Sequence, residues 1–107
     1  MCATQTVLHQ NDIGSIAICN GCQYIHIEIG NYMTVLCSHA FKLIIEDFNK
    51  ISSTIEDYTL STPSGEKVLI QLTTNSFISQ TPDDFEETLL MFEMANHFLQ
   101  AKQILKS

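Results

Sequence analysis

The chain has 107 residues, 45% of them apolar and 16% charged, which is typical of one globular domain over residues 1–107 rather than of a disordered chain. Twelve acidic residues against five lysines and no arginine give a formal net charge of −7. Binding to nucleic acid or to an anionic membrane requires a basic surface, so this balance excludes both kinds of partner.

The first residues, Met1 to Thr6, contain neither the basic start nor the apolar core of a secretory signal. No apolar run approaches the roughly 18 residues that a membrane-spanning helix needs. We therefore expect a cytoplasmic protein, in a compartment that keeps thiols reduced. Its four cysteines are then predicted to be thiols, metal ligands or redox groups rather than a disulfide framework.

The first half of the chain predicts an antiparallel meander. Residues 1–13 show little periodicity and are interpreted as a loose lead-in. Apolar residues alternate from Gly14 onward, as in strands. Asn20-Gly21 predicts a two-residue turn, because both of its central positions need a positive φ. A second strand, a second tight turn and a third strand then follow, at 24–29, 30–31 and 32–36.

Apolar residues adopt helical spacing after Cys37-Ser38, and the helix should end near Ser52-Ser53. Ser38 or Cys37 is predicted to cap the helix, and serine is the better cap on physical grounds. The same plan recurs 44 positions later. We predict an α+β domain of two tandem β-β-β-α units, about 14–53 and 58–105, with the helices packed on the sheet. Chance similarity is the alternative, because few identities carry the repeat: Gly21 and Gly65, Asn31 and Asn75, Phe41 and Phe85, Phe48 and Phe92.

The middle strands of the two units disagree in phase. The apolar face of the first is Ile25, Ile27 and Ile29, whose counterparts are Leu69, Gln71 and Thr73. The apolar set of the second unit is instead Val68, Ile70 and Leu72. This strand has either slipped by one residue or is covered on both faces.

The second helix is predicted from Pro82 to about Leu105, with Thr81 as its N-cap. One apolar stripe contains Phe85 and Phe92, and another lies on the opposite side. A helix that is apolar on both sides is either sandwiched within the monomer or shared with a partner. We expect a symmetric homodimer through residues of the second stripe: Met91, Met94, Phe98 and Leu105.

Cys19 and Cys22 form a C-x-x-C motif across the predicted turn. Across a two-residue turn their side chains share one face, and alternation brings the residues after the third strand to the same end. Three sulfurs and an imidazole make a tetrahedral zinc set, so the predicted metal ligands are Cys19, Cys22, Cys37 and His39. There are two alternatives to zinc binding. The cysteines are half-buried thiols without a ligand, or they take part in redox or nucleophilic chemistry.

Residues 19–41 resemble a small bacterial family of uncharacterised C-x-x-C domains. The resemblance rests on Cys19-x-x-Cys22, the alternating strand after it, Gly30-Asn31 and the start of a helix toward Phe41. In the second half, a strand followed by Thr81-Pro82-Asp83-Asp84-Phe85 is similar to that family's C-terminal helix. The resemblance spans most of residues 14–105. It implies a bacterial, cytoplasmic protein and implies neither a mechanism nor metal binding.

Three functional hypotheses follow. The first is a non-enzymatic, self-associating binding or scaffold module with a structural zinc site, which binds a second copy or another protein. The second is a thiol-dependent enzyme or redox protein that uses Cys22 or Cys37 with His39. The third is a dimeric domain whose cysteines are incidental. The sequence contains no Gly-rich phosphate loop, no H-E-x-x-H and no serine elbow.

Overall fold

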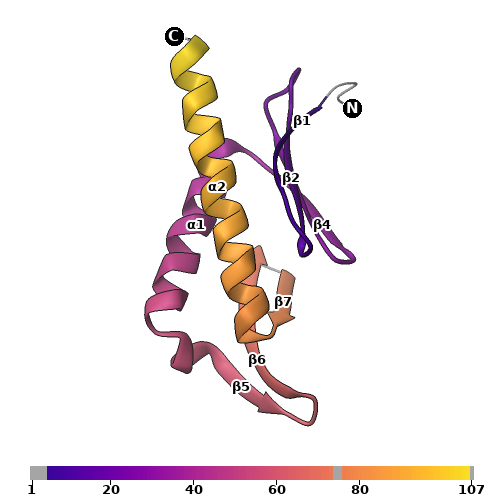
Figure 1. Ribbon diagram of the computed structural model, residues 1–107, viewed down its shortest axis with the longest axis vertical. Helices are drawn as coiled ribbons and strands as arrows, with labels where there is room; N and C mark the ends of the chain where they lie inside the picture. The colour runs from indigo at the N-terminus through magenta and orange to yellow at the C-terminus, as the bar shows by residue number, and fades with distance from the viewer. Residues whose placement is uncertain (1–4, 74–75, 107) are drawn as a thin grey trace.

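A computed structural model describes residues 5–73 and 76–106, and their side chains except at 73, 76 and 102–106. Within these residues the fold is α+β, with two antiparallel sheets against which two long helices pack (Figure 1). Sheet A has the order β1-β2-β3-β4 and sheet B the order β5-β6-β7. The elements are β1 (Gln5–Gln10), β2 (Gly14–Cys19), β3 (Ile25–Ile29), β4 (Tyr32–Leu36), α1 (Ser38–Ser53), the 3-10 turn η1 (Ile55–Tyr58), β5 (Thr59–Thr62), β6 (Gly65–Thr73), β7 (Ser76–Gln80) and α2 (Pro82–Lys106).

Residues 5–10 form an edge strand, so their interpretation as part of a loose lead-in is wrong. Strand β1 pairs with β2 and has a bulge between Val7 and His9. Burial alternates along the strand as far as the buried Leu8, and the bulge interrupts the alternation after it. A pattern search for a two-residue period therefore misses this strand.

Five residues, 20–24, connect β2 to β3, so the two-residue turn predicted at Asn20-Gly21 is wrong. The Cys19 N–H donates to the Tyr24 carbonyl oxygen at 2.9 Å, and the Gln23 N–H donates to the Cys19 carbonyl oxygen at 2.9 Å. Gln23 adopts the positive φ, 65°, that closes the loop. Cys22 consequently lies in the loop and not in a strand opposite Cys19.

The predicted helix boundaries and the predicted cap of α2 are confirmed. Helix α1 ends at Ser53, but its N-cap is Cys37, which makes no side-chain capping hydrogen bond, and not Ser38, which the sequence favours. Helix α2 begins at Pro82, and the Thr81 hydroxyl accepts a hydrogen bond from the Asp84 N–H at 3.1 Å. This is the capping interaction that the sequence predicts.

A bulge in β6 explains the phase difference between the two halves. Gln71 pairs with Phe77 and Thr73 pairs with Ser76, so Leu72 is an extra residue on the β6 side. Before the bulge, Val68 and Ile70 point to the core and are fully buried, whereas Leu69 is exposed. The strand has therefore shifted by one residue, and the extra residue restores the phase before β7.

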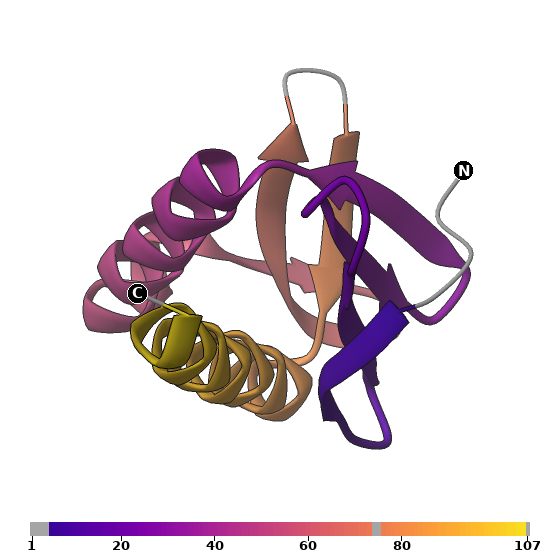
Figure 2. The same ribbon diagram turned by 90° about the horizontal axis from the view of Figure 1, so that it is seen from above.

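One continuous core joins both sheets and both helices. Helix α2 is about 37 Å long, at 1.5 Å per residue, and contacts β1 and β2 of sheet A, β6 and β7 of sheet B, and α1. Figure 2 shows the two helices side by side on one side of the molecule, with the sheets on the other. The helices meet through four fully buried phenylalanines with ring centroids 4.9–5.7 Å apart: Phe41, Phe48, Phe85 and Phe92.

Each half contains three antiparallel strands before a helix, and β1 is an addition to the first half. That the halves are a tandem repeat stays a prediction. No helix in the described part of the chain is both long and apolar enough to cross a membrane.

Gly14 provides a test of the β2–β3 packing. It pairs with Ile29, and a Cβ added there would overlap the Glu28 carbonyl oxygen. We predict that Gly14→Ala lowers the free energy of unfolding by about 1–3 kcal/mol, because the backbone must move apart. Gly21→Ala is the matched control, since its Cβ would approach no atom closer than the Cys19 Sγ at 4.0 Å.

Urea denaturation followed by circular dichroism measures both variants. Gly21→Ala should change the free energy of unfolding by less than about 0.5 kcal/mol. Equal losses in the two variants would contradict the close contact at Gly14.

Candidate functional site

The predicted metal ligands lie on neighbouring segments at one end of sheet A. Cys19 ends β2, and Cys22 lies in the loop that follows. Cys37 comes directly after β4, whose last residue pairs with the first residue of β3. The topology thus brings the three cysteines to the same end of the sheet, as the sequence predicts.

The three cysteines differ in burial and in covalent state. Cys19 is fully buried and disulfide-bonded, whereas Cys22 and Cys37 are exposed thiols outside any disulfide. The Cys22 N–H donates to the Cys19 Sγ at 3.4 Å. Since metals bind thiolates, a zinc site that includes Cys19 requires its reduced form, and the disulfide differs from the reduced state that a cytoplasmic location predicts.

His39 lies in the first turn of α1 and is exposed, so it does not continue the alternation of β4. Within residues 5–73 and 76–106, no three His, Cys, Asp or Glu side chains are close enough together to hold a metal ion. Zinc binding by Cys19, Cys22, Cys37 and His39 therefore stays a prediction. The alternative of thiol chemistry at Cys22 or Cys37 stays one as well.

A second candidate site is the outer surface of α2. Three large apolar side chains one helical turn apart are about half exposed: Leu90 (50%), Met94 (46%) and Phe98 (48%). We call these three residues the α2 stripe. The buried residues of the same helix, such as Phe92, occupy its opposite side. The helix is thus apolar on two sides, and one of them faces solvent.

The α2 stripe differs in membership from the predicted dimer contact. Met94 and Phe98 are exposed as expected, but Met91 is fully buried and cannot reach a second copy without leaving the core. Leu90 takes its place, at the i, i+4, i+8 spacing that the sequence already contains. The side chain of Leu105 lies outside the described residues.

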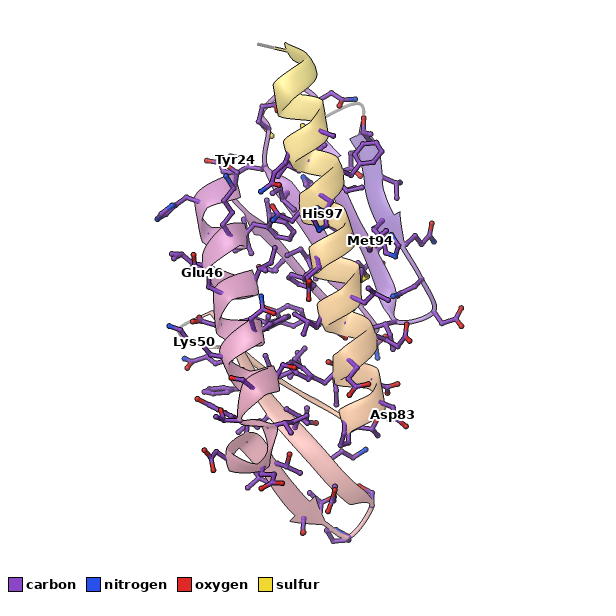
Figure 3. All side chains as sticks on the ribbon, turned by 60° about the vertical axis from the view of Figure 1, so that its left-hand side comes forward. Tyr24, Glu46, Lys50, Asp83, Met94 and His97 are labelled. Carbon is purple, nitrogen blue, oxygen red and sulfur yellow. The ribbon has the colours of Figure 1, made fainter. Side chains whose placement is uncertain are left out.

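Charge is distributed unevenly along α2. Figure 3 shows Asp83, Met94 and His97 along its length. The ionisable residues of α2 are all acidic as far as Glu93, and after Glu93 they are only histidine and lysine. The acids are Asp83, Asp84, Glu86, Glu87 and Glu93, and the bases are His97, Lys102 and Lys106.

No protein family, curated protein or solved structure matches this chain. The resemblance to a bacterial C-x-x-C family therefore stays a prediction. Function has to be inferred from the chain's own residues and their arrangement.

We predict that iodoacetamide modifies Cys22 and Cys37 in the folded protein, because both thiols are exposed. Cys19 should be modified only after reduction and denaturation. Peptide mass spectrometry locates the modified residues, and metal analysis of protein purified without chelator accompanies it. The prediction would be contradicted if Cys22 and Cys37 reacted with iodoacetamide only after a chelator was added, and if the protein contained about one zinc per chain. That result would support the zinc site.

Proposed function

We propose that the chain is a non-enzymatic binding module that associates with a second copy of itself through the α2 stripe. The observation that carries this proposal is the row of three half-exposed apolar side chains, Leu90, Met94 and Phe98. They make an apolar strip about 12 Å long, at 1.5 Å per residue. Contiguous exposed apolar surface with polar borders is typical of interaction sites.

The stripe suits an antiparallel pair of α2 helices with a twofold axis at Met94. Such an interface uses the same patch on both copies. Phe98 of one copy then packs against Leu90 of the other, and the two Met94 side chains meet at the axis. Methionine adapts well to such a contact because its side chain is unbranched and flexible.

Charge complementarity favours a second copy as the occupant. In the antiparallel pair, Glu86 and Glu87 of one helix lie opposite the turn that contains Lys102 in the other. Opposite charges on the rim of an interface guide association and fix its register. A parallel pair would instead place acidic turns against acidic turns.

We also propose that the two halves derive from one repeated β-β-β-α unit. Strands β4 and β7 begin at Tyr32 and Ser76, and helices α1 and α2 begin at Ser38 and Pro82. Both intervals are the 44 residues of the sequence repeat. The bulge at Leu72 supports the proposal, because it accounts for the difference in phase between β3 and β6.

We predict that the native protein sediments as a dimer of the 12.1 kDa chain, and that Met94→Glu weakens the dimer at least about tenfold. The substitution places two carboxylates face to face at the axis. The native fold should persist, because Met94 is 46% exposed and the core does not depend on it. Sedimentation velocity measures the association, and circular dichroism confirms the fold.

Gln100→Glu is the matched control, because it adds the same charge at an exposed position of α2 outside the stripe. This variant should remain dimeric. A native protein that is monomeric at about 100 μM, well above the dissociation constant of a stable dimer, would contradict self-association and leave another protein as the partner. A Met94→Glu variant that stays dimeric would contradict the role of the stripe.

A further inference from the structure

A pocket of about 640 Å³ lies between α1 and sheet B. Strand β5 pairs only with the first part of β6, from Gly65 to Val68. Strand β6 continues beyond that point and leaves a space between itself and the C-terminal half of α1. The lining comes from α1, η1, β6 and β7: Asp47, Lys50, Ile51, Tyr58, Leu69, Gln71, Leu72 and Phe77.

The body of the pocket is apolar. Ile51 and Leu72 are buried and form its floor. Around them stand three large side chains that remain about half exposed: Tyr58 (43%), Leu69 (41%) and Phe77 (55%). Ligand pockets typically measure about 300–1,000 Å³ and combine apolar walls with a few polar groups. This pocket has both properties.

Two opposite charges stand at the rim. Asp47 and Lys50 are exposed residues of α1, and residues three apart on a helix lie on the same side. Lys50 projects from the side of α1 away from α2 (Figure 3). No ion pair involving either side chain is formed within the part of the chain that the structure describes, so both charges remain available to a ligand.

We propose that this pocket binds a free α-amino acid with a large apolar side chain. Such a molecule carries a carboxylate and an ammonium on one carbon, which suits the Lys50 ammonium and the Asp47 carboxylate together. Its side chain then packs among Tyr58, Leu69 and Phe77. A ligand with only one charge is attracted by one rim residue and repelled by the other, so the pair selects a zwitterion.

Isothermal titration calorimetry with L-phenylalanine tests the proposal, with 3-phenylpropionate and 2-phenylethylamine as probes that each lack one charge. L-phenylalanine should bind saturably, and each probe about fivefold or more weakly. Two results would overturn the proposal. One is the absence of binding by L-phenylalanine and L-leucine at about 10 mM, well above a millimolar dissociation constant. The other is a singly charged probe that binds as well as the amino acid.

Variants of the rim residues distinguish binding in this pocket from non-specific binding elsewhere on the protein. Asp47→Asn and Lys50→Gln should each weaken L-phenylalanine about three- to tenfold. Glu46→Gln and Lys42→Gln are matched controls, because both are exposed residues of α1 outside the pocket lining. All four positions are exposed, so the variants should keep the native circular dichroism spectrum. Equal weakening by the rim variants and the controls would overturn the proposal.

Discussion

The structure depends on the packing of four phenylalanines between α1 and α2. Phe48 contacts both Phe85 and Phe92, and Phe41 stacks on Phe92. Burial of each side chain contributes about 1.5–3 kcal/mol, and each aromatic pair adds about 0.5–1.5 kcal/mol. Because α2 also contacts strands of both sheets, this cluster fixes an element that joins the two halves.

The same packing determines which side of α2 faces solvent. With Phe85 and Phe92 directed toward α1, the α2 stripe is left on the opposite side of the helix. Thr88 adds a second constraint near the start of α2. Its fully buried hydroxyl lies 2.9 Å from the Asp84 carbonyl oxygen and 3.0 Å from the side-chain oxygen of Gln80, at the end of β7. Rotation of the helix would break the contact with Gln80 and leave its buried side-chain oxygen without this partner, which costs about 1–3 kcal/mol.

Regular periodicity predicted the elements that are regular. Strand Tyr32–Leu36 and the start of α2 at Pro82 match the sequence expectation to the residue. The departures occur where backbone geometry breaks the period, at the bulge beside Leu8 and at the bulge at Leu72. The five-residue connection at 20–24 departs for another reason, because Gln23 and not Gly21 takes the positive φ.

The sequence predicted less of the candidate sites than of the fold. The sequence shows the C-x-x-C motif, but not that Cys19 is disulfide-bonded, because covalent state depends on which sulfurs meet in space. Helical spacing predicts the stripe on α2, although it also places the buried Met91 on the exposed side of the helix. The pocket beside α1 has no signature in the sequence, since its lining is spread from Asp47 to Phe77 over four elements.

The contact between the two ends of the described chain has a consequence for biosynthesis. Strand β1 packs on α2, and the Asn11 side chain donates to the Glu87 carbonyl oxygen, 76 positions further along the chain. Translation at about 5–20 residues per second takes roughly 4–15 s to cover that distance. During this interval sheet A has no helix α2 to cover its inner face, so the nascent protein exposes the isoleucine-rich strands β2 and β3. Packing of α2 then removes a surface of the kind that makes partly folded chains prone to aggregation.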